Sequence, residues 1–381
     1  MTMAKRVRLA MIGGGNGAFI GEVHRIAARM DNRFELVAGV FNADPVRGRA
    51  SAAAIGIDQA RVYDSEMAMF AAEARRDDGA EAVAIVTPNH LHGAAAMAAL
   101  DAGFHVICEK PMTATLAEAE ALAAHVRRSG KIFVLTHTYT GYPMIRQARA
   151  MVAAGEIGTL RRVQAEYAQD WLAEPLEHRG VPGAVWRTDP AKAGLGGAIG
   201  DIGTHAFNLA GFVTGEQPTH LLADLTSFVA GRRLDDDAGI LLRYASGAKG
   251  SIWVSQIAVG NGNNLSLRVY GTRGGLEWRQ EAPEDLWFTP LGAPKQLLRR
   301  NGAGVVDAAS ATSRVPSGHP EGYLEAFANL YREAADAILA ARTGSFDLRA
   351  LPSAEDGLRG LALITACLRS SEDGCWVAIG P

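Results

Sequence analysis

The sequence predicts an α/β protein: a doubly wound parallel sheet followed by an α+β domain built on an antiparallel sheet. The chain of 381 residues is longer than one hydrophobic core usually supports, so two domains are expected. Short runs rich in Val, Ile and Leu alternate with alanine-rich segments from residue 6, which is typical of βαβ units. After about residue 140 the strands follow one another closely, which favours antiparallel neighbours.

The first domain is expected to cover residues 1–140. Its strands are RVRLAMIG, FELVAGVF, EAVAIVTP, HVICEKP and IFVLTHTY, and its helices lie near 19–29, 45–54, 66–76, 91–102 and 116–128. Pro45 suits the first turn of a helix after Asp44, and Thr115 with Glu118 forms a capping box. This half should therefore be a domain of the nucleotide-binding type.

The second domain is expected to cover residues 141–381. A helix opens at Pro143, TLRRVQAEYAQDWL forms a strand, residues 173–200 form a loop, and IGTHAFNLAGFV forms a helix. The remaining strands are HLLADLTSFV, AGILLRYA, GSIWVSQIAV, LSLRVYGT and GLEWRQ. A long loop (291–318), two helices (321–341 and 353–370) and the short strand WVAI complete the chain. The expected architecture is an α+β layer.

Composition and charge exclude several classes of function. A net charge of −3 without a basic cluster argues against nucleic acid as a partner. No apolar run reaches the roughly 20 residues of a membrane span, and the start leads directly into a strand, so no membrane contact and a cytoplasmic location are expected. Cys108, Cys367 and Cys375 lack metal-ligand spacing, so neither a metal site nor a disulfide framework is expected.

A glycine-rich turn follows the first strand. MIGGGNGAFIG fits G-x-G-x-x-A at Gly13, Gly15 and Ala18, with Asn16 in the same loop. Glycines in such a turn let the backbone approach a pyrophosphate, which is held at the N-terminus of the next helix. Because the motif follows a strand and opens a helix, it predicts a dinucleotide cofactor.

The second strand is followed by Asn42, where dinucleotide-binding folds usually carry an acidic residue for the ribose hydroxyls. Asn42 can bond a ribose without repelling a 2′-phosphate, and Arg47 can attract one. Asp44 either contributes to this site or caps the following helix. The cofactor is therefore expected to be NAD, with NADP left open.

Two further strand ends should face the cofactor, because the carboxyl ends of a parallel sheet line the ligand crevice. TPNHLH supplies one turn, in which Thr87, Pro88, Asn89 and His92 are candidate cofactor contacts. CEKP supplies the other, with Lys110 placed to hold a substrate oxygen and Glu109 to orient the turn. The alternative for Lys110 is a simple ion pair with Glu109.

The segment GDIGTHAFNL carries an acid and a histidine in an otherwise small and apolar run. On a helix, Asp201 and His205 stand at i and i+4 and face the same way. His205 can then accept a proton from an alcohol, and Asp201 can orient it and stabilise its charged form. The alternative is a helix cap and a core histidine, but the surrounding AGLGGAIGDIG is expected to leave room for a ligand.

With MIGGGNGAFIG, TPNHLH, CEKP and GDIGTH in this order, the chain resembles the Gfo/Idh/MocA oxidoreductases over almost its whole length. The resemblance implies a Rossmann domain followed by an open-faced, mostly antiparallel sheet that supplies substrate and oligomer contacts. It implies that Lys110 contacts substrate near the nicotinamide and that His205, with Asp201 beside it, is the general base. It also implies that WRTDPAKAGLGG is a loop on the substrate side.

The residues of the expected site fall into three groups. Catalytic roles are expected for Lys110, Asp201 and His205. Cofactor contacts are expected from Gly13, Gly15, Asn16, Ala18, Asn42, Arg47, Thr87, Pro88, Asn89, His92, Glu109 and Lys110. Substrate contacts are expected from Lys110, Tyr139, Gln169, Trp171, Trp186, Arg187, Asp201, His205 and His319. In YAQDW, Tyr167, Gln169 and Trp171 should share one face of a strand.

The expected function is that of an NAD(P)-dependent dehydrogenase, which transfers a hydride between a nicotinamide and a secondary hydroxyl of a sugar, glycoside or cyclitol. Two alternatives stay open. One is an NAD-dependent glycosidase that oxidises the ring transiently, eliminates the aglycone and reduces the ring again. The other is a non-catalytic sugar sensor, which has no need of a proton acceptor. A homodimer or homotetramer is expected, because exposed sheet faces usually pair.

Overall fold

The computed structural model describes residues 6–344 and 351–380. The expected domains 1–140 and 141–381 also include residues 1–5, 345–350 and 381, which lie outside the described residues. The chain forms two compact units: 1–138 with 327–358, and 139–326 with 359–381. The sequence assigned all of 141–381 to the second domain, whereas residues 327–358 group with the first unit. The unit boundaries fall within the helices α11 (Tyr323–Ala341) and α12 (Ala354–Asp373).

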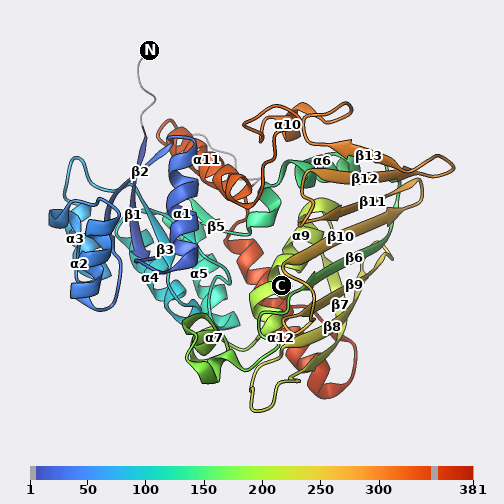
Figure 1. Ribbon diagram of the computed structural model, residues 1–381, viewed down its shortest axis with the longest axis horizontal. Helices are drawn as coiled ribbons and strands as arrows, with labels where there is room; N and C mark the ends of the chain where they lie inside the picture. Colours follow the sequence, from blue (N-terminus) through green and yellow to red (C-terminus); the bar gives the residue numbers. More distant parts are fainter. Residues whose placement is uncertain (1–5, 345–350, 381) are drawn as a thin grey trace. The chain divides into compact units, whose positions relative to one another are not determined.

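The first unit contains the predicted doubly wound parallel sheet, in the order β2-β1-β3-β4-β5 (Figure 1). Its strands are β1 (Val7–Gly13), β2 (Phe34–Val40), β3 (Ala82–Val86), β4 (His105–Cys108) and β5 (Phe133–Leu135). Its helices are α1 (Phe19–Met30), α2 (Pro45–Ala54), α3 (Glu66–Glu73), α4 (His92–Asp101) and α5 (Leu116–Ser129). All four strand pairings are parallel, so the carboxyl ends of the strands meet at one edge.

Local signals in the sequence explain where two of these helices begin. The Asp44 carboxylate accepts from the amide of Val46 at 2.9 Å and so caps α2. Thr115 and Glu118 form the expected capping box at the start of α5. Asp44 therefore caps α2, while a ribose contact by Asp44 or Asn42 stays a prediction.

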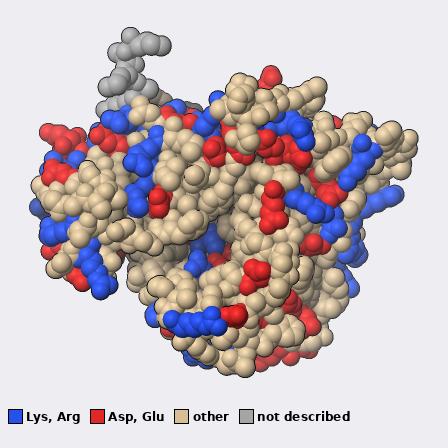
Figure 2. Space-filling view, viewed as in Figure 1, with Lys and Arg blue, Asp and Glu red and all other residues tan. Residues whose placement is uncertain are grey.

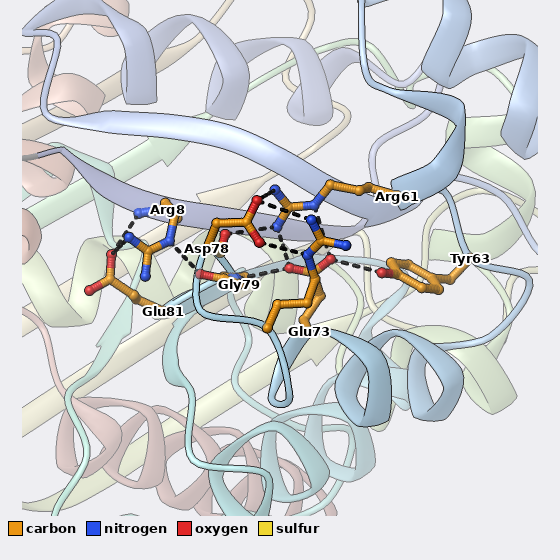
Figure 3. Close-up of polar contacts among 9 residues, drawn as sticks. Arg8, Arg61, Tyr63, Glu73, Asp78, Gly79 and Glu81 are labelled. Atoms are coloured by element: carbon orange, nitrogen blue, oxygen red, sulfur yellow. Dashed lines mark hydrogen bonds and ion pairs between the residues drawn. The ribbon is translucent and has the colours of Figure 1, made fainter.

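A buried polar cluster joins α3 to the loop before β3 (Figure 3). Glu73 is 1% exposed, and its carboxylate accepts from both Arg61 and the Tyr63 hydroxyl, the latter at 2.8 Å. It also accepts from the amide of Ala80 at 2.9 Å. Burial alone would raise the pKa of Glu73, but these donors lower it below its usual value. The cluster fixes the position of α3 beside the sheet.

The second unit is built on a nine-stranded sheet in the order β13-β12-β11-β10-β6-β9-β8-β7-β14 (Figure 1). The pairing of β6 with β9 is parallel and the other seven are antiparallel, which confirms a mostly antiparallel sheet. Its strands are β6 (Leu160–Ala168), β7 (Pro218–Thr226), β8 (Asp237–Tyr244), β9 (Lys249–Ser255), β10 (Asn264–Gly271), β11 (Gly274–Arg279), β12 (Asp285–Pro290), β13 (Gln296–Arg299) and β14 (Val377–Ala378).

Helices cover one face of this sheet. In Figure 1, α6 (Pro143–Ala153), α9 (Thr204–Thr214) and the second-unit part of α12 lie on the same side of the strands. Burial alternates along β8, where Ile240 is 2% and Leu241 45% exposed. The uncovered face therefore carries exposed apolar side chains, among them Leu241, Trp253 and Tyr270.

The structure differs from the sequence-based expectation in several loops. Residues 173–200, expected to be loop, contain the short helices α7 (Pro182–Arg187) and α8 (Pro190–Ala193). The strand β12 was not predicted, and the expected loop 291–318 contains β13 and α10 (Asp307–Ser310). These elements are short, so the sequence offers too few residues to show a period.

Charges of both signs are interspersed on the visible face of the molecule (Figure 2), in line with the net charge of −3. Among the described residues, no helix combines the length and the apolar composition needed to cross a membrane.

Candidate active site

The glycine-rich turn of the first unit has the geometry that a dinucleotide-binding loop requires. Gly13 and Gly17 each have φ of +83°, which is a region where other residues are strained. A Cβ added to Gly15 would lie 2.3 Å from the backbone oxygen of Phe41. The backbone therefore passes close to its neighbours here, as the motif predicts.

The helix that follows this turn begins without a side-chain cap. Its N-cap residue is Ala18, which makes no capping hydrogen bond. The Asn16 amide donates to the Ser51 hydroxyl at 3.1 Å, and this bond holds the loop against α2. The uncapped amides at the start of α1 and the adjacent glycines suit a pyrophosphate. These residues therefore fit a dinucleotide cofactor.

The residues at the end of β2 are exposed. The Asn42 side-chain oxygen accepts from the amide of Asp44 at 2.9 Å, which turns the chain into α2. Arg47 is exposed and lies 3.7 Å from the Asp44 carboxylate. Asn42 occupies the position after β2 where dinucleotide-binding folds usually carry an acidic residue. The contacts of Asn42 and Arg47 with a ribose stay predictions.

His92 connects the two strand-end turns of the first unit. It is fully buried, and its ring nitrogens lie 2.7 Å from the Thr87 carbonyl and 2.8 Å from the Pro111 carbonyl. These two bonds let His92 link both turns, and its predicted contact with a cofactor stays a prediction. Thr87 itself keeps a buried hydroxyl without a hydrogen-bond partner in the described part of the chain, and Pro88 starts the short helical turn Asn89–Leu91.

Glu109 anchors the turn that carries Lys110. Its carboxylate accepts from the Thr136 hydroxyl at 2.5 Å and from the amide of Lys110 at 3.1 Å. It also lies 2.9 Å from Nε2 of His24, whose Nδ1 is 2.7 Å from the Tyr331 hydroxyl. Although burial raises the pKa of Glu109, its contacts with His24, Lys110 and Thr136 lower it below its usual value. Glu109 is therefore a buried carboxylate that orients the turn, as predicted for it.

Asp201 lies in a π-helical turn, Ile199–Gly203, which leads directly into α9. Its Oδ2 accepts from Nε of Arg187 at 3.2 Å and from Nε2 of Gln256 at 2.9 Å. Asp201 thus lies in a π-helical turn and His205 in the α-helix that follows. The α-helical spacing of i and i+4 that was expected between them is therefore altered. These two partners fix the Asp201 carboxylate in the second unit, while its action on His205 stays a prediction.

His205 is 8% exposed and belongs to an aromatic cluster at the start of α9. Its ring meets that of Tyr139 edge-on, with centroids 4.9 Å apart. The hydroxyl of Tyr139 is hydrogen-bonded to that of Tyr167, which donates to Oδ1 of Asn263 at 2.7 Å. Burial raises the pKa of Tyr167 well above its usual value, so this hydroxyl stays protonated. His205 thus contacts the rings of two tyrosines, Tyr139 and Tyr167, whose hydroxyls are hydrogen-bonded to each other.

The predicted residues of YAQDW join the same network. β6 ends at Ala168, yet the Gln169 amide donates to Asn263 at 2.7 Å and its oxygen accepts from the Trp171 indole at 3.1 Å. The Arg187 guanidinium stacks over the rings of Trp186 and Trp171, 4.2 and 5.7 Å from their centroids. The second unit thus brings together indoles, amides, hydroxyls and one ion pair.

One predicted residue is not part of this network. His319 is exposed, and its backbone carbonyl accepts from the buried Arg300. A substrate contact from His319 stays a prediction.

Sequence reasoning did not identify Asn263 and Gln256, which bind Tyr167 and Asp201. Gln256 lies inside the predicted strand GSIWVSQIAV and Asn263 two residues before the predicted strand LSLRVYGT. The pairing of β6 with β9 and β10 brings these segments together. The glycines before Asp201 were expected to leave room for a ligand. A Cβ added to Gly197 would instead lie 2.0 Å from the backbone oxygen of Asp235, so this glycine allows two backbone segments to touch.

No group of His, Cys, Asp and Glu suited to a metal ion occurs among residues 6–344 and 351–380. The described residues supply a proton acceptor, hydrogen-bond donors and a dinucleotide loop.

Comparison with known proteins agrees with this geometry. Residues 7–138 match the model of the oxidoreductase family with an NAD-binding Rossmann fold, and residues 145–277 match the GFO/IDH/MocA C-terminal domain. The chain is 37% identical to the uncharacterized oxidoreductase YfiI of Bacillus subtilis, over 98% of this chain and 97% of that protein.

Two solved structures share the whole architecture. An oxidoreductase from Sinorhizobium meliloti is 52% identical, with a TM-score of 0.89 over 98% of this chain and 100% of that one. An inositol dehydrogenase homolog from Azotobacter vinelandii, in complex with NADH and myo-inositol, is 38% identical, with a TM-score of 0.92 over 98% of each chain.

Proposed function

Because the chain belongs to the GFO/IDH/MocA family of oxidoreductases and contains its NAD-binding Rossmann domain, we propose that it is an NAD(P)-dependent dehydrogenase for a secondary hydroxyl of a sugar, glycoside or cyclitol. The observation that carries this proposal is the position of His205 against the rings of Tyr139 and Tyr167, whose hydroxyls are hydrogen-bonded to each other. A histidine beside hydroxyl groups suits an uncharged polyol that loses a proton.

The proposed roles are those of a proton acceptor and of groups that support it. His205 accepts the proton of the substrate hydroxyl, and Lys110 donates to the same oxygen and stabilises its developing negative charge. Asp201, held by Arg187 and Gln256, stabilises the protonated His205. Bound NAD⁺ supplies the hydride acceptor. These roles need no metal ion.

The substrate class is supported by the chemistry of the second unit. Indole rings pack against the apolar faces of sugars and cyclitols, and the amides of Gln169 and Asn263 can exchange hydrogen bonds with their hydroxyls. The relative from Azotobacter vinelandii binds myo-inositol according to its description. The substrate of the present enzyme is therefore sought first among inositols and related polyols.

The test is NADH formation at 340 nm with a panel of inositols, sugars and glycosides, with NAD⁺ and NADP⁺ in parallel. Oxidation of one polyol by the wild type, and a loss of about 10²–10⁴-fold in kcat in His205→Asn, is expected. His220→Asn serves as the matched control, because His220 is an exposed histidine in the same unit. Aglycone release without net NADH would contradict the dehydrogenase assignment and indicate a redox-assisted glycosidase. Ligand binding without turnover would indicate a sensor.

We also propose that the uncovered face of the nine-stranded sheet pairs with a second copy of the chain. Leu241 on β8, Trp253 on the adjacent β9 and Tyr270 on β10, one strand beyond β6, are 45, 39 and 41% exposed. Exposed apolar groups of this size on a sheet face indicate association. Size-exclusion chromatography with light scattering should show a dimer or tetramer, and Trp253→Glu should shift it toward the monomer. A monomeric wild type would contradict this proposal.

A further inference from the structure

A loop far from Asp201 in the sequence supports the segment that carries Asp201 and His205. The loop spans residues 227–236 and connects β7 to β8. The carboxylate of Asp235 accepts from the amides of Gly197 and Ile199, both at 2.7 Å. Its backbone carbonyl also accepts from the amide of Ala198 at 2.8 Å. Asp235 therefore binds three consecutive amides at the start of the helical segment.

These three amides lie at the start of a helical segment, where backbone amides lack acceptors within the helix. A carboxylate is the strongest neutralising partner for them. Asp201 follows directly, and its own amide donates to the carbonyl of Gly197 at 2.9 Å. One hydrogen bond thus links the position of Asp201 directly to that of Gly197.

The neighbouring residue Asp236 supports Asp201 from the other side. Its carbonyl accepts from the amide of Gln256 at 2.9 Å, and the Gln256 side chain donates to Asp201. Its carboxylate accepts from the amides of Phe228 and Val229 and pairs with Arg232. The loop is therefore fixed internally, and it is hydrogen-bonded to Gly197 and Gln256, each of which is hydrogen-bonded to Asp201.

The contact between the two segments leaves no spare space. A Cβ added to Gly197 would lie 2.0 Å from the backbone oxygen of Asp235, so only glycine permits this approach. Burial raises the pKa of Asp235 to about 6, and Asp236 adds to the rise, although the two amide donors oppose it. At neutral pH the carboxyl is still ionised and can accept from both amides.

We propose that Asp235 is a positioning residue, which holds the π-helical turn so that Asp201 and His205 keep the orientation required for proton transfer. The proposal rests on the dehydrogenase function proposed above for the roles of Asp201 and His205. It adds a residue that touches no substrate and acts through Gly197 and Ile199.

The test compares Asp235→Asn with the wild type at pH 8. Asparagine keeps the size of the side chain but turns an NH2 group toward one of the two amides. We expect kcat to fall about tenfold or more through misplacement of the catalytic groups, while the Kd of NAD stays within about twofold, because the glycine-rich loop lies in the other unit. Asp224→Asn is the control, since Asp224 is an exposed aspartate on the adjacent β7.

A substrate-independent readout accompanies the kinetics. In protein labelled with ¹³C-histidine, the ring signal of His205 is assigned from its disappearance in His205→Asn. We expect Asp235→Asn to move this signal and its titration midpoint, and Asp224→Asn to leave both unchanged. An unchanged His205 signal together with unchanged kcat would overturn the proposal. If no polyol of the panel is oxidised, the dehydrogenase assignment fails, while the His205 signal still decides the role of Asp235.

A measurement on the wild type covers the case in which Asp235→Asn does not fold. The amide signals of Gly197 and Ile199 and the side-chain amide signal of Gln256 are followed from pH 5 to 8. We expect a shared inflection near pH 6, where Asp235 takes up a proton. The charged and titratable groups near Asp235 are Asp236 in its own loop, Cys367 on α12, and Arg233 and Glu372, which line the same cavity. Titration of the backbone amides without a response of Gln256 would overturn the proposal.

Discussion

The ring of His205 lies edge-on to the ring of Tyr139, with the two planes at 82° and the centroids 4.9 Å apart. This contact limits rotation of the imidazole, because an aromatic edge and face attract each other in that orientation. Tyr139 is itself held by its hydroxyl, which is hydrogen-bonded to Tyr167. The proposed proton acceptor is therefore oriented by its contact with a tyrosine ring that is itself held in place.

Tyr139→Phe tests this arrangement. The ring contact with His205 is kept, but the bond to the Tyr167 hydroxyl is lost, which should cost about 1 kcal/mol and lower kcat/KM roughly fivefold. Steady-state kinetics on the substrate found in the panel measure the effect. His220→Asn, at an exposed histidine in the same unit, should behave as the wild type. A loss as large as that of His205→Asn would contradict a supporting role for Tyr139.

The glycine-rich turn predicts different outcomes for two neighbouring glycines. In Gly15→Ala the new Cβ would lie 2.3 Å from the Phe41 carbonyl oxygen, so the loop must move and NAD affinity should fall at least about tenfold. Gly17 has open space around it but φ of +83°, so Gly17→Ala should cost about 1–2 kcal/mol of stability with less effect on binding. Calorimetric titration with NAD and thermal unfolding measure both. Equal losses of affinity would contradict the close backbone approach at Gly15.

The buried Glu73 should contribute more to stability than a surface ion pair. Glu73→Gln removes the buried carboxylate that Arg61 binds in the cluster of Figure 3 and leaves the exposed Asp78 at 3.9 Å, which should lower the free energy of unfolding by about 3 kcal/mol. Urea titration measures this change. Glu35→Gln is the control, because the pair of Arg6 and Glu35 at 3.0 Å is exposed and should be worth about 0–1 kcal/mol. Similar effects of both variants would contradict the cluster's structural role.

His105 should make the protein sensitive to acid. Burial, with the charge of Lys131, lowers the pKa of His105 to about 4, whereas an unfolded histidine takes up a proton near pH 6.5. Between pH 4 and 6.5 the unfolded chain therefore binds more protons than the folded chain. The stability that the neutral His105 contributes is complete above pH 6.5 and is lost as the pH falls to 4. Urea unfolding at pH 7, 6 and 5 should show a loss on the order of 2 kcal/mol that His105→Asn lacks. His90→Asn, at an exposed histidine, should keep the wild-type dependence.

Much of the fold could be predicted from the sequence, because strong local signals agreed with the tertiary structure. Thr115 and Glu118 mark a helix start through bonds to adjacent residues, and the alternation along β8 reflects one covered face. The short helices α7 and α8 lack such a period. The grouping of residues 327–358 with the first unit depends on contacts distant in the sequence, such as that of Tyr331 with His24.

The candidate site was predictable where a motif carried it. Asp201 and His205 share one short segment, and Lys110 lies in CEKP. Gln256 and Asn263 carry no such signal, since strand pairing alone brings them to the site. The role proposed for Asp235 could not be predicted from the sequence either, because it depends on a contact between Asp235 and Gly197, which are 38 residues apart.

The most direct test of the proposed function is to compare His205→Ala with the wild type for both hydride transfer and NAD binding. Single-turnover NADH formation with the substrate found in the panel reports the first, and calorimetric titration reports the second. For His205→Ala we expect the rate of hydride transfer to fall by about 10²-fold or more, while the Kd of NAD stays within about twofold of the wild type. The control His220→Ala should match the wild type in both rate and Kd. Equal losses in rate and in NAD affinity, or a rate that is unchanged, would contradict the assignment of His205 as the proton acceptor.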